Sequence, residues 1–409
     1  MAIYLMAILC SVFIAEVFIF LEFQTAPETP IYADFRHFYT AAKMVATGAA
    51  SQLYNIDAQT AFQHEIIYPY KSEVGILPYN HPPFQIIAYI PLIILPLKWA
   101  YRVWIIVSLG LIAISLSTLG SYFRPASRNG QLIMWLVCLS FFPTFATLLL
   151  GQDSAISLLI FTLTFYYIKK GKEGSAGAIL ALGLFKPQLV GITAIIFLFK
   201  RRWKALGCFC LVGLLLISLS IFMVGWQGVI EYLRLIIKSA TWENQYGIFP
   251  SKMYNLKAFF YLIFGFDQME FLIPALGFTM IGFLTLLFFV WRGKWEPSAY
   301  LFDLKFSLLI MVTLLVNPHL YAHDLILWII PGILLVNYLN RENPKIKGYM
   351  LEALLPIGYM SIILSSLYSI SLNLKIGVIF TIVAVALLAY EIILFKRSQG
   401  GYNDGKELS

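Results

Sequence analysis

The chain has 409 residues, of which 60% are hydrophobic and only 12% are charged, and its mean hydropathy is +0.80. A composition this apolar lies far outside the range of soluble globular domains and excludes that class. The formal net charge of +8 does not require a nucleic-acid partner, because the basic residues lie in short clusters between apolar segments, where they act as orientation signals.

Apolar segments long enough to cross a bilayer recur from the first residue almost to the C-terminus. Inside a membrane such segments must be helices, because lipid offers no hydrogen-bond partner to an open backbone. The sequence therefore predicts an all-α fold, a polytopic integral membrane helical bundle located in the cell membrane.

We expect about 12 transmembrane helices in a single membrane domain over residues 1–397. The polar residues 398–409 are predicted to form a disordered cytoplasmic tail. The predicted spans are Met1–Glu22, Trp99–Gly120, Leu132–Leu150, Ala155–Ile168, two short arms within Ser175–Phe199, Ala205–Val224, Glu270–Trp291, Tyr300–Val316, Leu325–Leu339, Met350–Ser369 and Leu374–Phe395.

The basic clusters predict how these helices are oriented. By the positive-inside rule the clusters face the cytoplasm, together with both termini. The two long segments Gln24–Pro83 and Trp226–Asp267 then face outward. The basic residues concerned are Arg124 and Arg128; Lys169, Lys170 and Lys172; Lys200, Arg201, Arg202 and Lys204; Arg292 and Lys294; Arg341, Lys345 and Lys347; and Lys396 and Arg397.

The stretch Ser175–Phe199 lies between two of these clusters and is too short for two full crossings of about 20 residues each. Pro187 interrupts it, since proline ends a helix. We expect a shallow hairpin that carries Lys186 into the outer half of the membrane. A single continuous span with one misplaced cluster is the alternative.

Each long outer loop is predicted to contain a helix that lies on the membrane surface. Apolar residues within Phe35–Val45 recur at helical spacing, and Gly48 follows as a stop. This pattern predicts an amphipathic helix with Asp34 at its N-terminus. In the second loop, apolar and charged residues alternate over Ile230–Lys238 and predict a second interfacial helix.

Short motifs are spread along most of the chain: Asp34-Phe35-Arg36-His37-Phe38-Tyr39; Ala41-Ala42, Gly48 and Leu53-Tyr54; Tyr79-Asn80-His81-Pro82-Pro83; Pro91-Leu92; Gly151-Gln152; Ala176-Gly177 with Lys186-Pro187-Gln188; and Asn317-Pro318-His319. In this order and spacing they resemble glycosyltransferase family 87. That family contains polyprenol-phosphate-mannose-dependent mannosyltransferases of the GT-C class. The resemblance implies a GT-C fold with its active site on the extracytoplasmic side.

The resemblance also implies that Asp34 is the catalytic residue, because the family's catalytic aspartate occupies this place in the first loop. Such an aspartate would take the proton from the acceptor hydroxyl in a direct displacement that inverts the anomeric carbon. Taken alone, Asp34 has a second interpretation, since aspartate is a favoured N-cap and a helix is expected to begin there. One residue can serve both roles.

Lys186 is predicted to bind the phosphate of the donor, together with His319 and His323. A lysine at this depth needs a partner or water, and an anionic phosphate is such a partner. The alternatives are a lysine that snorkels to the surface, or an internal ion pair with Asp153. The two histidines are spaced i, i+4, but no third ligand at a recognisable spacing supports a metal site.

Four further residues are assigned to substrate positioning on the strength of the resemblance: His37, Gln152, Asp153 and Gln188. For His37, as for His81, the residue type alone favours a polar surface residue of an interfacial loop.

The sequence thus predicts a membrane hexosyltransferase that transfers a hexose, with mannose as the first choice, from a polyprenyl phosphate sugar donor to a lipid or glycan acceptor. A lipid carrier is expected because nucleotide sugars are cytoplasmic, whereas the candidate site faces outward. Membrane lipids are the remaining expected partners, and no cofactor, metal or nucleic acid is expected. The rival functions are a polymerase or ligase of lipid-linked glycans and a lipid or sugar transporter, although no internal repeat typical of transporters is present.

Overall fold

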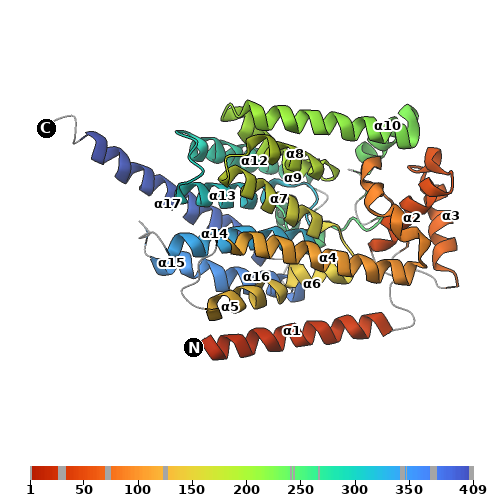
Figure 1. Cartoon of the computed structure of the whole chain (residues 1–409), viewed down its shortest axis with the longest axis horizontal. Helices are drawn as coiled ribbons and strands as arrows, with labels where there is room; N and C mark the ends of the chain where they lie inside the picture. Colours follow the sequence, from red (N-terminus) through yellow and green to blue (C-terminus); the bar gives the residue numbers. More distant parts are fainter. Residues whose placement is uncertain are drawn as a thin grey trace.

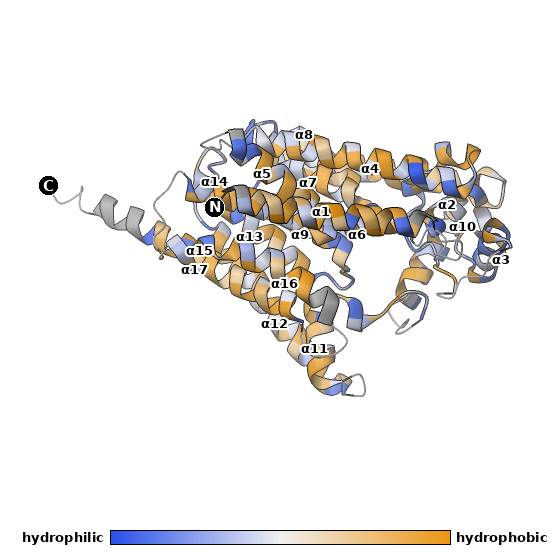
Figure 2. Ribbon diagram, turned by 90° about the horizontal axis from the view of Figure 1, so that it is seen from below, coloured by the Kyte–Doolittle hydropathy of each residue, from blue (hydrophilic) through white to orange (hydrophobic). Residues whose placement is uncertain are grey.

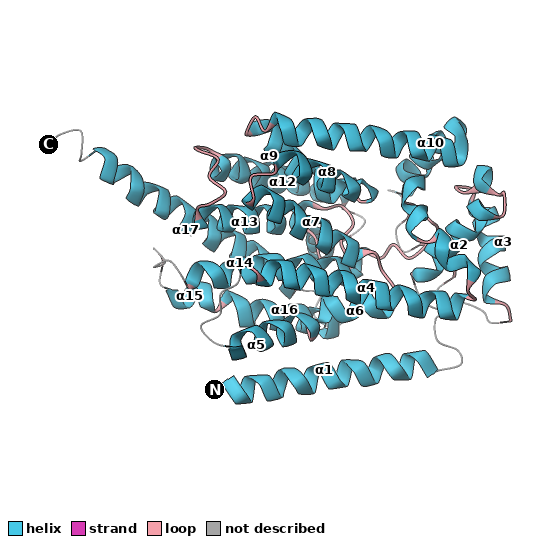
Figure 3. Cartoon of the chain, in the orientation of Figure 1, coloured by secondary structure: helices cyan, strands magenta, loops and turns pink. Residues whose placement is uncertain are grey.

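The computed structural model describes residues 2–25, 34–69, 75–122, 128–239, 242, 245–265, 268–340, 346, 348–368 and 375–404. Within these ranges the regular elements are α-helices and short 3-10 helices, with one isolated bridge between Gln245 and Ile248 (Figure 3). The predicted all-α class is confirmed.

The helices follow the apolar segments of the sequence closely. The α-helices are α1 (Ala2–Thr25), α2 (Phe35–Ala46), α3 (Ile56–Ile67), α4 (Leu97–Gly120), α5 (Arg128–Leu139), α6 (Phe142–Leu150), α7 (Ser154–Lys169), α8 (Glu173–Leu182), α9 (Pro187–Phe199), α10 (Trp203–Ser239), α11 (Leu256–Phe264), α12 (Met269–Trp291), α13 (Tyr300–Val316), α14 (Ile329–Leu339), α15 (Gly348–Glu352), α16 (Leu354–Tyr368) and α17 (Ile376–Asp404). The 3-10 helices are η1 (Ala50–Gln52), η2 (Pro83–Ala88), η3 (Ile90–Ile94), η4 (Gly183–Phe185), η5 (Pro250–Lys252) and η6 (Ala322–Trp328).

Far fewer helices than predicted are long enough to cross a bilayer. Six of the described helices have the length and hydropathy of a full span, or seven if α5 and α6, which are bent by 50°, count as one. The predicted number of about 12 is therefore not shown. The reason is length: α7 has 16 residues, which extend about 24 Å, less than the roughly 30 Å of a hydrocarbon core.

The hairpin predicted around Pro187 is present. Helix α8 ends in η4, Pro187 opens α9, and an ion pair joins Glu173 at the start of α8 to Arg202 just after α9. Both ends of the stretch therefore lie at the same end of the bundle. Gly177 lets α8 pack directly against α10, because a Cβ there would lie 1.8 Å from the carbonyl oxygen of Ala205.

The basic loops gather at one end of the bundle. Lys169 Nζ lies 2.7 Å from Asp303 Oδ1, which brings the end of α7 to the start of α13. Lys200 and Lys396 both donate hydrogen bonds to carbonyls at the C-terminal end of α12. Helix α1 begins and α17 ends at this end, whereas α2 and α3 lie at the other (Figure 1). Of the predicted basic residues, Arg124, Arg341, Lys345 and Lys347 lie outside the described part of the chain.

Helix α2 is not an interfacial helix, contrary to the expectation. Phe35 and Phe38 are fully buried, and the polar residues Arg36, His37 and Thr40 are buried as well. Both the apolar and the polar side of α2 pack against protein, since α3, η2, η3 and α4 surround the helix. In Figure 2 the helices of the bundle are mostly hydrophobic along their length, and hydrophilic residues gather at its two ends.

The second predicted interfacial helix is the last part of α10. Gly225 interrupts the helical backbone, with φ 73° and ψ 170°, and the segment beyond it turns away from the membrane-length portion. Leu233 and Ile237 on this segment are exposed, at 54% and 74%. An apolar side of this segment is therefore exposed, as an interfacial helix requires.

Helix α17 continues to Asp404, so the first part of the predicted tail is helical. Extending an existing helix adds one hydrogen bond per residue without a new nucleation step. The prediction of disorder rested on the polar composition of the tail, which does not take this effect into account. Residues 405–409 of the tail lie outside the described part of the chain.

The hairpin predicts that the two loops flanking it lie on the same side of the membrane. In a variant without the four native cysteines, Lys172→Cys and Trp203→Cys should both react with a membrane-impermeant maleimide only from the cytoplasmic side. Gln52→Cys, at the opposite end of the bundle, should react only from the outside. Labelling of positions 172 and 203 from opposite sides would contradict the hairpin.

Candidate functional site

A cavity of about 910 Å³ opens beside the N-terminus of α2, at the end of the bundle away from the basic loops. Its wall is made by segments distant in sequence: the start of α2, the loop before η2, the α6–α7 turn, the hairpin tip, the end of α10 with the loop after it, and the loop before η6. Seven of the eight predicted site residues line it: Asp34, His37, Gln152, Lys186, Gln188, His319 and His323. The eighth, Asp153, is fully buried behind the wall.

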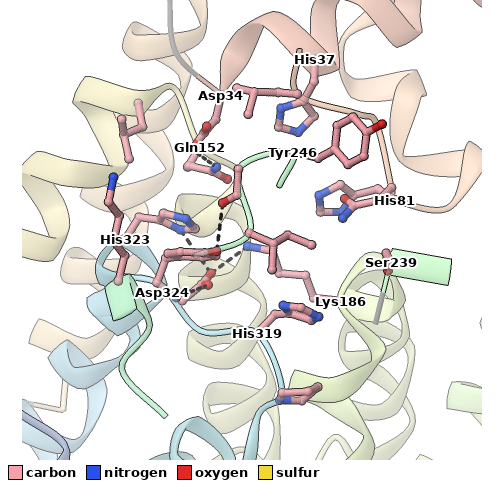
Figure 4. Close-up of a pocket in the computed structure, with 18 of the residues that line it drawn as sticks. Asp34, His37, His81, Gln152, Lys186, Ser239, Tyr246, His319, His323 and Asp324 are labelled. Carbon is pink, nitrogen blue, oxygen red and sulfur yellow. Dashed lines mark hydrogen bonds and ion pairs between the residues drawn. The ribbon is translucent and has the colours of Figure 1, made fainter. Parts of the chain in front are cut away.

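Asp34 is held at the cavity wall by a side-chain hydrogen bond. Gln152 Nε2 donates to Asp34 Oδ2 at 2.5 Å (Figure 4). The predicted N-cap bond is not formed: the Asp34 side chain caps no backbone group, and its own backbone is helical. The carboxylate is therefore directed toward the cavity and Gln152 instead of toward the start of α2.

Gly151 explains how these two residues come together. It ends α6 in the left-handed conformation, with φ 65°. A Cβ at this position would lie 2.7 Å from the Cβ of Phe35 and 3.0 Å from the ring of Tyr101. Only glycine both adopts this backbone and lets α2 approach so closely, so the Gly151-Gln152 motif places the amide against Asp34.

Lys186 lies between two carboxylates. Its Nζ is 2.6 Å from Asp153 Oδ1 and 2.7 Å from Asp324 Oδ1, and all three side chains are buried. Gln85 Nε2 donates to the other oxygen of Asp153 at 2.6 Å. The internal ion pair with Asp153, one of the two alternatives to phosphate binding, is thus present. The group has one positive and two negative charges, so Lys186 does not bring a net positive charge to the cavity.

Asp324 and Gln85 are not marked by any sequence motif. Asp324 stands at the start of an apolar segment, where a carboxylate needs a cation, but the sequence does not say which one. Its partner Lys186 is 138 positions away. Only the packing of the hairpin against η6 brings the two together.

His323 is fixed by the residues around the ion pairs. Its Nδ1 lies 2.9 Å from Ser154 Oγ and 3.4 Å from Asp324 Oδ1. The Ser154 hydroxyl also donates to Asp324 at 2.9 Å. The backbone carbonyl of His323 accepts a hydrogen bond from Thr147. His323 is therefore oriented toward Asp34 and the cavity by a rigid, buried network.

The other histidines of the cavity are neutral at pH 7. Burial lowers the pKa of His319 to about 4. Burial also lowers the pKa of His37 well below its ordinary value, with the neighbouring His81 as the next cause. The rings of His37 and His81 are stacked, with centroids 6.0 Å apart and planes 7° apart. These groups offer hydrogen bonds to a substrate but no charge. His37 is buried, so the expectation of a polar surface residue is wrong for it.

Burial has the opposite effect on Asp34, where it raises the pKa of the carboxyl above its ordinary value. Four groups oppose this effect and favour the ionised form: His323, the hydrogen bond from Gln152, Arg36 and Lys186. The carboxylate is thus a stronger base than a solvent-exposed aspartate and stays within reach of positive charge.

The described residues contain no group of three or more His, Cys, Asp or Glu side chains arranged to hold a metal ion. Asp153 and Asp324 are held near each other, but the ammonium group of Lys186 lies between them.

Two comparisons bear on the identity of the chain. The model of glycosyltransferase family 87 matches residues 79–318. The match includes Gln152, Asp153 and Lys186, begins after Asp34, and ends just before His319. A search of curated proteins finds no match.

Removing the cation of the buried group should destabilise the fold. Lys186→Met leaves the buried carboxylates of Asp153 and Asp324 without a cation, and breaking a buried pair costs about 3 kcal/mol. We expect a lower free energy of unfolding by that amount, measured by thermal or denaturant unfolding in detergent. Gln188→Ala is the control, because Gln188 lines the same cavity without a hydrogen bond or ion pair to any described residue, and it should change stability by less than about 0.5 kcal/mol. Equal stability of the two variants would show that the ion pairs do not hold the hairpin tip.

Proposed function

Because the chain belongs to glycosyltransferase family 87, it is a membrane glycosyltransferase, and we propose that it transfers a hexose, with mannose as the first choice, from a polyprenyl phosphate sugar to a lipid or glycan acceptor. The observation that carries the proposal is the Asp34 carboxylate, hydrogen-bonded to Gln152 in the wall of a cavity large enough for a sugar. In this proposal Asp34 is the general base.

The proton transfer follows from the contacts of Asp34. Oδ2 accepts the hydrogen bond from Gln152, and Oδ1 has no hydrogen-bond partner among the described residues. An acceptor hydroxyl that donates to Oδ1 would lose its proton to Asp34 as its oxygen attacks the anomeric carbon. The new C–O bond forms as the bond between the anomeric carbon and the phosphate oxygen breaks, and the electron pair leaves with the phosphate. Attack opposite the leaving group inverts the anomeric configuration.

The phosphate is stabilised by hydrogen-bond donors more than by net charge. Two of the three N–H groups of Lys186 point to Asp153 and Asp324, which leaves one for a phosphate oxygen. His319, which is neutral, and His323 line the same cavity and can add further hydrogen bonds. A phosphate is a good leaving group, so this donor set is sufficient without a protonated acid. Gln152, Asp153, His37 and Gln188 then position the substrates or the residues that bind them.

The location of the cavity supports a lipid-linked donor. The cavity lies at the end of the bundle opposite the basic loops. By the positive-inside rule that end faces outward, where nucleotide sugars are absent. The tip of the short hairpin lies at the cavity, so a polyprenyl chain has a route from the bilayer to Lys186 along helices that do not span the membrane.

The role of Asp34 is tested by Asp34→Asn. Asparagine accepts the hydrogen bond from Gln152 and caps a helix as well as aspartate does, but it cannot take a proton. We expect the variant to insert and unfold like the wild type and to lose activity by about a hundredfold or more. The measurement is mass spectrometry of lipids and glycans after incubation with donor, where one added hexose marks transfer and a ladder of masses would mark a polymerase. Retained turnover would rule out Asp34 as the base.

The pH profile gives a second readout of the same group. Because the pKa of Asp34 is raised, the carboxyl is protonated and inactive below a pH that is higher than the pKa of an ordinary aspartate. The wild-type rate should therefore rise with pH through that value and then level off. An acid limb at or below the ordinary aspartate range would contradict a buried base.

We also propose that transfer needs no divalent ion, since the ammonium group of Lys186 occupies the position between the Asp153 and Asp324 carboxylates where a cation would bind. Purified protein should keep its activity in excess EDTA, and magnesium or manganese should raise it little. If chelation abolished transfer and manganese restored it, Asp34 would be a metal ligand instead of a base.

A further inference from the structure

A second cluster of charged side chains lies at the basic end of the bundle, away from the cavity. At its centre is Lys305, in the second turn of α13, whose side chain is only 8% exposed. Lys200, at the end of α9, and Lys396, on α17, lie close enough to act on its charge. The acidic group that faces them is Glu296, which is exposed to solvent. One exposed carboxylate does not balance three ammonium groups.

Lys305 differs from the neighbouring buried charge, Asp303, in having no ion-pair partner within the described part of the chain. Asp303, two residues earlier in α13, has Lys169 as a partner at 2.7 Å. The side chain of Lys305 forms no hydrogen bond or ion pair with any described residue, and its Nζ is not among the buried polar atoms that are closed off from solvent. A mostly buried ammonium group without a partner is incompletely solvated, and an anion from outside the chain can reach it and pair with it.

The other two lysines already bind oxygen atoms of the protein. Lys396 Nζ donates to the carbonyls of Val290 at 2.8 Å and Arg292 at 3.1 Å, and Lys200 donates to that of Gly293. These contacts anchor both ammonium groups at the C-terminal end of α12, where the helix dipole favours cations. The two lysines are thus fixed in place beside Lys305, and each keeps N–H groups for a further acceptor.

The depth of the cluster in the membrane identifies the anion. Candidate spans end at Trp291 in α12 and at Arg397 in α17, so the lysines lie where apolar helices leave the bilayer. The anion that is abundant at this depth is the phosphate of anionic phospholipids. Exposed apolar side chains begin next to the cluster, at Leu198 and Phe288, which are 50% and 45% exposed. They offer a surface to the acyl chains of the same lipid.

We propose that Lys305, Lys200 and Lys396 bind the phosphate of an anionic phospholipid, whose chains lie along α9 and α12. The bound phosphate joins the ends of α9, α12, α13 and α17, of which α12, α13 and α17 pack against one another and α9 packs against α13. Helix α9 begins directly after Lys186, so the lipid also holds the hairpin that carries this residue. The site is independent of the proposed sugar transfer.

The test is native mass spectrometry of the full-length protein in a neutral detergent, titrated with phosphatidylglycerol or phosphatidylcholine of identical chains. We expect the wild type to bind phosphatidylglycerol about tenfold more tightly, as a cluster of surface lysines does. Lys305→Met should lose this preference. It replaces the ammonium group with an apolar side chain of similar size, so it should fold at least as stably without lipid. Lys294→Gln removes an exposed cation from the same end of the bundle and should keep the preference.

Equal preference in Lys305→Met and the wild type would overturn the proposal. Thermal unfolding with added lipid or inorganic phosphate separates the two sources of a phosphate group. Phosphatidylglycerol, but not inorganic phosphate, should raise the midpoint of the wild type, and an equal effect of both would rule out a lipid site. If Lys305→Met does not fold, Lys396→Met tests the same cluster, with loss of the preference expected and its retention contradicting the proposal.

Discussion

The arrangement of the site depends on the buried ion pairs of Lys186 with Asp153 and Asp324. The three residues come from the start of α7, the tip of the hairpin and the segment η6, which are far apart in the sequence. In a membrane bundle the two buried carboxylates are not tolerated without the ammonium group of Lys186, because removing it leaves both charges uncompensated. The hairpin tip is therefore fixed in depth and direction, and so is the wall of the cavity that it forms.

Asp34 depends on this framework through its neighbours. Gln152 is adjacent in sequence to Asp153, so the residue that orients the proposed base is next to one that holds the lysine. Gly151 allows α2 to pack against this turn, and the aromatic cluster around Phe38 and Tyr89, with rings 4.6 Å apart and parallel within 1°, buries the rest of the helix. A carboxylate placed on such a helix is shielded from bulk water on one side and open to the cavity on the other.

The two ends of the bundle differ in how their charged groups are balanced. At the cavity, Lys186 is paired with two carboxylates of the protein, and His37 and His319 are neutral hydrogen-bonding groups. Such a site suits a reaction in which charge moves from an acceptor to a leaving phosphate, because donors that are already oriented need not reorganise. At the opposite end, cations outnumber their partners and the membrane supplies the counter-charge. The asymmetry follows the positive-inside rule.

The sequence alone determined the all-α class, the positions of the long apolar helices and the break at Pro187, because hydropathy and backbone preferences are encoded within windows of some twenty residues or fewer. It also placed Asp34, Gln152 and Lys186 together through the resemblance of short motifs. It did not determine the number of full spans, since that depends on how short helices such as α7 pack inside others. Nor did it assign Asp324 and Gln85 to the site, or show that α2 is buried within the protein. The sequence pattern of an amphipathic helix is the same whether its apolar side packs against lipid or against protein. The sequence also does not identify which residue pairs with a buried charge. Those choices are made by packing between segments far apart in the sequence, 68 residues for Gln85 and Asp153 and 138 for Lys186 and Asp324, which only the tertiary structure decides.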